Sequence, residues 1–133
     1  MLLIAATQVV HSLDGMDEIT TSAPTTIWHV KGTAVDKHIL HPEDLGLARH
    51  EVEKLLGSSP ENNAKDFFDI LKGEGKSALR DFLLINAGVA LFVAGAAASM
   101  KDGVAKAREC IDSGSAKSFL DKYIRLSNSL QQV

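Results

Sequence analysis

The sequence predicts an α/β fold in which one buried strand and a β-hairpin precede about five helices. Three observations support this prediction: an apolar run at residues 2–10, two short β-branched segments at residues 25–31 and 34–40, and helical periodicity from Arg49 onward. The chain has 133 residues, a length that usually forms one domain and can bury a substantial core. We therefore expect residues 1–133 to form one unit.

The first expected element is a strand at residues 2–10, which are apolar almost throughout. A continuous apolar run is typical of a strand buried on both faces in a parallel sheet. Residues 11–18 then form a loop, in which Gly15 supplies a permissive backbone position. The adjacent carboxylates Asp17 and Glu18 should lie just beyond the carboxyl end of the strand, where open α/β sheets bind ligands.

The second expected element is a β-hairpin at residues 25–31 and 34–40, which are rich in Thr, Ile and Val with Gly32 between them. Side chains alternate between the two faces of a strand. We therefore expect Trp28 and Val30 to share one face of the sheet.

The rest of the chain has helical spacing and helix boundary residues. Ser59 and Pro60 form an N-cap followed by proline at the first helical position. Residues 82–98 contain Asn86 as their only polar side chain, and their small residues indicate a central helix surrounded by protein rather than a membrane span. We expect one helix before Gly57, one from Pro60 to about Gly73, one at residues 79–98, one at residues 104–111 before Gly114, and a last one at residues 119–126.

Composition excludes several classes of function. The formal net charge is -3 and there is no basic stripe, so nucleic acid is not an expected partner. A membrane partner is not expected either. The single cysteine, Cys110, cannot form an internal disulfide, which indicates a reduced, cytoplasmic protein in which Cys110 is a small buried side chain.

Several blocks along the chain resemble, in the same order, those of anthranilate phosphoribosyltransferases. The resemblance runs from about Ile4 to Leu126 without a gap. The blocks are Val9-Val10-His11, Asp14-Gly15-Met16-Asp17-Glu18-Ile19, Pro24-Thr25, Pro42-Glu43-Asp44-Leu45-Gly46-Leu47, Asn63-Ala64, Arg80-Asp81, Leu84-x-Asn86-Ala87 and Ala107-Arg108-Glu109-x-Ile111-Asp112-Ser113-Gly114.

The resemblance implies that residues 1–133 are the C-terminal portion of the nucleoside phosphorylase/phosphoribosyltransferase α/β domain. It also implies a pentosyltransferase reaction of tryptophan biosynthesis, in which phosphoribosyl passes from phosphoribosyl pyrophosphate to the amine of anthranilate and pyrophosphate leaves. In this family Mg²⁺ bridges an acidic pair to the pyrophosphate, and Asp17 and Glu18 stand at those positions. A solvent-open acidic pair suits Mg²⁺, which typically takes one or two carboxylates together with water and phosphate oxygens.

Other family segments have no counterpart in the sequence. These are a Gly-Thr-Gly-Gly-Asp phosphate loop, a Lys-His-Gly segment, the anthranilate-binding arginine and the N-terminal helical domain. We therefore expect a C-terminal fragment with no complete catalytic set, inactive without the missing N-terminal part. Separation from that part would expose strand edges and apolar surface, which favours self-association. Ser12 stands where the family has glycine, and this departure could alter the loop.

Single residues near the pair have competing interpretations. His11 is a possible ligand-loop residue or a strand-end histidine that hydrogen-bonds nearby backbone. Asp14 is expected to form the turn. Asn86 either satisfies a neighbouring loop, which we favour, or contacts the acidic loop. Two other functions stay open for the whole chain: a non-catalytic binding or assembly module, and a relative of the nucleoside phosphorylases.

Overall fold

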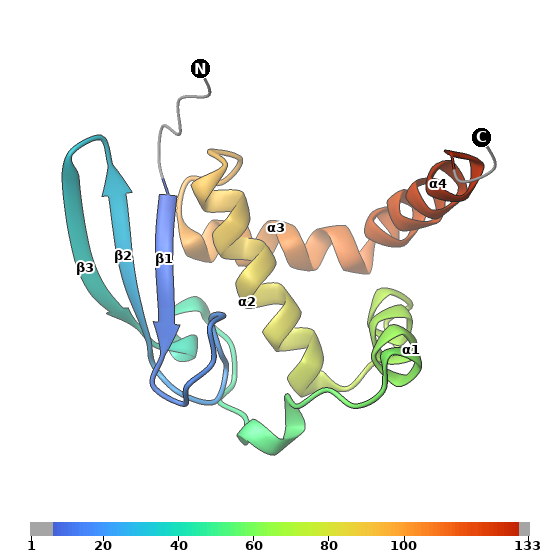
Figure 1. Ribbon diagram of the computed structural model, residues 1–133, viewed down its shortest axis with the longest axis horizontal. Coiled ribbons are helices and arrows are strands. Elements are labelled where there is room, and N and C mark those ends of the chain that lie inside the picture. The colour runs from blue at the N-terminus through green and yellow to red at the C-terminus, as the bar shows by residue number, and fades with distance from the viewer. Residues whose placement is uncertain (1–6, 131–133) are drawn as a thin grey trace.

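The computed structural model describes residues 7–130, in which a three-stranded sheet stands beside four α-helices (Figure 1). The predicted order of strand, hairpin and helices is confirmed. None of the helices in this described part of the chain is long and apolar enough to cross a membrane. The elements are β1 (Thr7–Ser12), β2 (Thr25–Lys31), β3 (Ala34–Leu40), the short 3-10 turns η1 (Pro42–Leu45) and η2 (Val52–Lys54), α1 (Pro60–Leu71), α2 (Ser77–Val93), α3 (Met100–Asp112) and α4 (Ser115–Leu130).

The sheet is antiparallel, with the strand order β1-β2-β3. The expectation of a buried parallel strand at residues 2–10 is wrong for its described part, because β1 pairs antiparallel with β2 and Val9 is 55% exposed. Consecutive parallel strands need a crossover, usually through a helix, and the loop at residues 13–24 contains no helix. Residues 2–6 of the expected strand lie outside the described residues.

The hairpin of β2 and β3 is confirmed, with Gly32 at φ +61° in its turn. One face of the sheet packs on the helices: Ile27 is fully buried there, and the rings of His29 and Phe92 of α2 are 6.2 Å apart. Alternation places Trp28 on the other face, where the Lys37 Nζ lies 5.4 Å from the centre of the indole ring. The sheet therefore has one covered face and one open face, and Figure 1 shows the helices to one side of it.

Helix α2 crosses α3 at a pair of glycines, and this is the most extensive contact between any two described elements. A Cβ atom on Gly88 would lie 2.5 Å from the Val104 backbone nitrogen, and one on Gly103 would overlap the Gly88 carbonyl oxygen. The small residues expected to allow close backbone approach do so at this point. Leu84 and Ile85 are fully buried beside the crossing and belong to the hydrophobic core.

Helix α2 is shorter than predicted, and its buried residues lie on one stripe while most of its other residues are only partly buried. It ends at Val93 instead of residue 98, because Gly95 takes a left-handed φ of +73° and turns the chain toward α3. Its buried positions fall on one stripe, whereas Ala90 is exposed. The prediction of a helix surrounded by protein is therefore wrong within the described residues.

Cys110 is exposed, so the prediction of a buried cysteine is also wrong. Helix α3 turns Gly103, Val104, Ala107 and Ile111 toward the core. Cys110 lies at the margin of that stripe, and its sulfur is 3.4 Å from the Ser115 hydroxyl oxygen.

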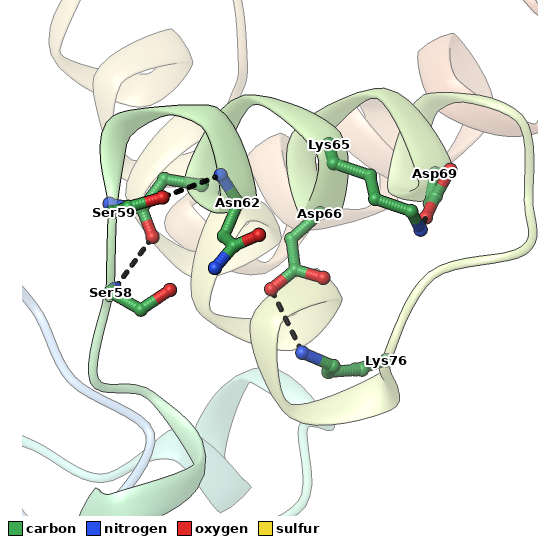
Figure 2. Close-up of polar contacts among 8 residues, drawn as sticks. Ser58, Ser59, Asn62, Lys65, Asp66, Asp69 and Lys76 are labelled. Atoms are coloured by element: carbon green, nitrogen blue, oxygen red, sulfur yellow. Dashed lines mark hydrogen bonds and ion pairs between the residues drawn. The ribbon is translucent and has the colours of Figure 1, made fainter.

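The boundaries of α1 follow the sequence signals. The Ser59 hydroxyl accepts a hydrogen bond from the Asn62 backbone N–H at 3.3 Å, and Pro60 occupies the first turn (Figure 2). The helix expected before Gly57 is only the 3-10 turn η2. The Asn63 side chain fixes the connection between these two elements, since its Oδ1 accepts a hydrogen bond from the Ser58 N–H at 2.8 Å.

Candidate functional site

The candidate site is built on the loop at residues 13–24, which joins β1 to β2. Backbone hydrogen bonds close this loop at its base. The Ser12 N–H donates to the Met16 carbonyl at 3.0 Å, and the Leu13 N–H donates to the Pro24 carbonyl at 3.0 Å. The loop therefore leaves the end of β1 with a defined backbone course.

Asp14 organises the first half of the loop, as predicted for a turn former. Its Oδ1 accepts a hydrogen bond from the Met16 N–H at 3.1 Å, and its Oδ2 accepts one from the Ser22 hydroxyl. Gly15 lies between Asp14 and Met16 at φ +93°, a backbone conformation that residues with a Cβ rarely adopt. Asp14 is thus committed to the loop rather than to a ligand.

The carboxyl of Asp14 makes this half of the loop sensitive to pH. Partial burial raises the pKa of Asp14, but hydrogen bonds from Ser22, Ser12 and the Met16 N–H outweigh it, and the pKa lies below its ordinary value of 3.8. A carboxyl with a lowered folded-state pKa stabilises the fold above its unfolded pKa, and this contribution is lost as the pH falls through the folded value.

We therefore expect the protection of the Met16 amide against hydrogen exchange to decrease as the pH falls below the ordinary carboxyl value of 3.8 and through the lower folded-state pKa of Asp14, relative to the Val89 amide in α2. Asp14→Asn is the control, because it keeps an acceptor and removes the titration. An equal decrease in wild type and Asp14→Asn would contradict the assignment of the pH dependence to Asp14.

Asp17 and Glu18 are exposed and follow directly after Met16. The carboxylates are hard oxygen donors of the kind that Mg²⁺ binds. No group of three or more His, Cys, Asp or Glu that could hold a metal ion occurs within residues 7–130. The donor set therefore fits Mg²⁺ only in the mode in which water and phosphate oxygens complete the metal's shell.

Asn86 of α2 holds the backbone at Ile19, directly after the acidic pair Asp17 and Glu18. Its Oδ1 accepts a hydrogen bond from the Ile19 N–H at 3.1 Å, and its Nδ2 donates to the Ile19 carbonyl at 2.7 Å and to the Phe82 carbonyl at 3.0 Å. Both interpretations of Asn86 given above are therefore correct together. It satisfies a neighbouring loop, and that loop is the acidic one.

A cavity of about 350 Å³ opens beside the acidic loop, between the loop, α1 and α2. Glu18 and Asn86 line it on the loop side, and Asn63 and Asp66 line it on the α1 side. Asp66 is paired with Lys76 at 2.9 Å (Figure 2). The sequence contains no signal that α1 packs near Glu18, so this cavity was not predicted. The apolar walls of the cavity are formed by Leu55, Leu56, Phe67, Ile70, Leu79, Phe82 and Leu83.

The two remaining sequence candidates lie on β1. Ser12, which replaces the family glycine, is fully buried at the strand end, and no non-glycine residue in the described part of the chain has a positive φ. Serine therefore takes this position without backbone strain. His11 is exposed and pairs with Thr26 across the sheet. Its role as a ligand-loop residue stays a prediction.

A polar contact that the sequence analysis did not predict ties the end of the loop to α2. His50 Nε2 lies 2.9 Å from Asp81 Oδ2, and the His50 backbone N–H donates to the Thr21 carbonyl at 2.9 Å. The two partners are far apart in sequence, and neither has a spacing that indicates the other. Helix α2 therefore supports the loop region at two places, Asp81 and Asn86.

These elements define a class of protein. The model of the glycosyl transferase family, a/b domain, matches residues 2–117, and the chain belongs to this family. The match includes the whole acidic loop and most of the helices described above.

Within that family the chain is similar to anthranilate phosphoribosyltransferases. The enzyme of Rubrobacter xylanophilus is 43% identical over 122 residues, which are 92% of this chain and 36% of that enzyme. The enzyme of Haloferax volcanii is 45% identical over 109 residues, which are 82% of this chain and 33% of that enzyme. The chain thus matches about a third of the length of these relatives.

Solved structures of anthranilate phosphoribosyltransferases share the fold. The Thermus thermophilus enzyme superposes with a TM-score of 0.81 at 38% identity, covering 90% of this chain and 35% of that one. A Saccharomyces cerevisiae structure in complex with PRPP and Mg superposes with a TM-score of 0.83 at 28% identity, covering 92% of this chain and 35% of that one. The predicted α/β fold class and the resemblance are confirmed.

Proposed function

We propose that this chain supplies the C-terminal part of the α/β domain of an anthranilate phosphoribosyltransferase. The reaction transfers phosphoribosyl from phosphoribosyl pyrophosphate to the amine of anthranilate, with release of pyrophosphate, in tryptophan biosynthesis. The observation that carries the proposal is the acidic loop, which presents Asp17 and Glu18 at the end of β1 in a chain of the matching fold. The single cysteine supports a cytoplasmic location for this reaction.

Asp17 and Glu18 would hold Mg²⁺, with phosphate oxygens and water completing its shell. The bound cation would offset the negative charge that collects on the departing pyrophosphate. The contribution of this chain is then to keep two carboxylates exposed on a backbone fixed by Asp14 and Asn86. A TM-score of 0.83 to a structure described with PRPP and Mg supports this arrangement.

The remaining substrate contacts would come from the part of the enzyme that this chain does not match in its relatives. The chain covers 36% of the Rubrobacter xylanophilus enzyme, and the phosphate-binding segments named above have no counterpart in its sequence. Two carboxylates recruit Mg²⁺ weakly when no neighbouring group binds the phosphates that complete its shell. We expect the chain by itself to be inactive.

This proposal is tested by combining the chain with the complementary N-terminal part of the Rubrobacter xylanophilus enzyme. We expect no loss of anthranilate fluorescence with either piece alone in the presence of phosphoribosyl pyrophosphate and Mg²⁺, and a loss when both are present. Chelation of Mg²⁺ should stop the reaction. Inactivity of a mixture in which both pieces are folded and associated would contradict the proposal, and so would turnover by the chain alone.

A non-catalytic binding or assembly module is the alternative function, and exposed apolar surface favours it. Phe119, Tyr123, Leu126 and Leu130 recur on α4 at helical spacing and are each at least 60% exposed. Self-association would cover such a stripe. Sedimentation of the chain as a monomer at high concentration would count against this alternative. A relationship to nucleoside phosphorylases is less supported, because phosphorolysis needs no acidic pair for pyrophosphate-bound magnesium.

A further inference from the structure

We propose that Asn86 is a positioning residue for the acidic pair, holding the loop on α2 so that Asp17 and Glu18 meet the cation on a fixed backbone. This inference rests on the proposed function, since the metal role of the pair is itself proposed. It assigns the task to the only polar side chain in the apolar run of residues 82–98.

The contact is specific to a carboxamide. One amide group uses its oxygen for the Ile19 N–H at 3.1 Å and its nitrogen for the Ile19 carbonyl at 2.7 Å, so both polar groups of one loop residue are satisfied together. The same nitrogen donates to the Phe82 carbonyl at 3.0 Å, one turn earlier in α2, which fixes the orientation of the side chain. No apolar replacement reproduces these bonds, and an unpaired buried backbone group is costly.

The position of Ile19 gives this contact its consequence. Ile19 is 3% exposed and follows directly after Glu18, whereas Met16, directly before Asp17, is held through its N–H by Asp14 and through its carbonyl by the Ser12 N–H. The acidic pair is therefore the exposed middle of a segment whose backbone is fixed on both sides. Loss of the Asn86 contact removes the polar anchor on the carboxyl side, where the buried Ile19 side chain and the hydrogen bond from the Thr20 N–H to Thr25 Oγ1 at 3.4 Å remain.

Groups that orient metal ligands without touching the metal strongly affect the affinity of the site for that metal. On the carboxyl side of Asp17 and Glu18, both backbone polar groups of Ile19 are bonded to the amide of Asn86, so this amide limits the freedom of the pair together with the buried Ile19 side chain. A fixed backbone lowers the entropy that the loop must lose on binding a cation.

Mn²⁺ added to the chain as a probe for Mg²⁺ tests the inference through paramagnetic broadening of the Asp17 and Glu18 amide signals. We expect Asn86→Ala to lower the affinity of the probe by about tenfold and to increase the fast backbone motion of both residues without metal. Asn86→Gln keeps the amide on a longer side chain that cannot make both bonds to Ile19 in the same geometry. It should fold and show the same changes to a smaller extent.

Two controls separate positioning from general destabilisation and from failure of the proposed function. Ile85→Val removes a methyl group from a fully buried side chain next to Asn86 and should lower stability without changing Mn²⁺ affinity or loop motion. Asp17→Asn with Glu18→Gln should abolish the local broadening, and persistence of the broadening in that variant would overturn the metal role itself. The positioning role alone would be overturned if both Asn86 variants kept wild-type Mn²⁺ affinity and loop motion while the acidic double variant no longer bound Mn²⁺.

Discussion

Gly103→Ala is expected to destabilise the fold by about 3 kcal/mol. The alanine Cβ would overlap the carbonyl oxygen of Gly88, a backbone atom of the opposite helix that cannot rotate away. Helices α2 and α3 would have to separate, which would loosen the packing of Leu84 and Val104 in the core. Urea unfolding followed by circular dichroism measures the change as a lower midpoint with an unchanged slope.

The sign of this effect is diagnostic, because alanine is favoured over glycine in a helix interior by about 1 kcal/mol. Without the close crossing, Gly103→Ala should stabilise the chain. Ala105→Leu is the matched control: it adds a larger side chain to the exposed side of the same helix and should change stability by no more than about 0.5 kcal/mol. A Gly103→Ala variant as stable as wild type would contradict the glycine-to-glycine crossing of α2 and α3.

The features that the sequence predicted correctly are those that neighbouring residues determine. Ser59 and Pro60 begin α1 because a hydroxyl and a fixed φ act within one turn. Gly32 and Gly114 mark a hairpin turn and a helix end because both need a positive φ, at +61° and +75°. Such signals act locally, so a sequence reveals them without knowledge of the tertiary fold.

The features that the sequence did not predict depend on which elements meet. The apolar pattern of residues 2–10 does not depend on the direction in which the strand pairs, so it did not distinguish a buried parallel strand from the antiparallel strand β1. Residues 82–98 are apolar on every side of a helix, so the pattern did not show that only one stripe of α2 is buried or that Gly95 ends the helix early. In both segments, uniform hydrophobicity contains no information about the covered face.

The candidate site shows the same division. Asp17 and Glu18 were predicted as metal ligands from the motif around them, and this role stays a prediction, whereas the turn role of Asp14 is confirmed. The link from Asn86 to Ile19 spans the distance from α2 to the loop, and the cavity beside Glu18 is formed with α1. Polar residues in apolar helices are signals of such contacts, because each one needs a partner, but the partner is known only from the fold.

Asp17→Asn combined with Glu18→Gln is expected to lower the rate of the reconstituted enzyme at least about a hundredfold. Both side chains keep their size and lose the charge that attracts Mg²⁺ under the proposed function, so the negative charge of the departing pyrophosphate would no longer be offset. The rate is measured as loss of anthranilate fluorescence in the mixture with the complementary N-terminal part, over a range of Mg²⁺ concentrations. Raising Mg²⁺ should restore part of the rate if binding of the cation is the step that the variant weakens.

Charge alone is controlled by a second pair of substitutions, Asp36→Asn with Glu53→Gln, which removes two exposed carboxylates from β3 and η2. This control changes the net charge equally and should leave the rate and its Mg²⁺ dependence unchanged. Because Asp17 and Glu18 are exposed as well, the acidic-loop variant should unfold at nearly the same urea concentration as wild type. A large loss of rate at unchanged stability assigns the effect to the metal site. A rate within a few-fold of wild type would mean that the pyrophosphate-bound cation has other ligands, and the proposed role of the pair would be wrong.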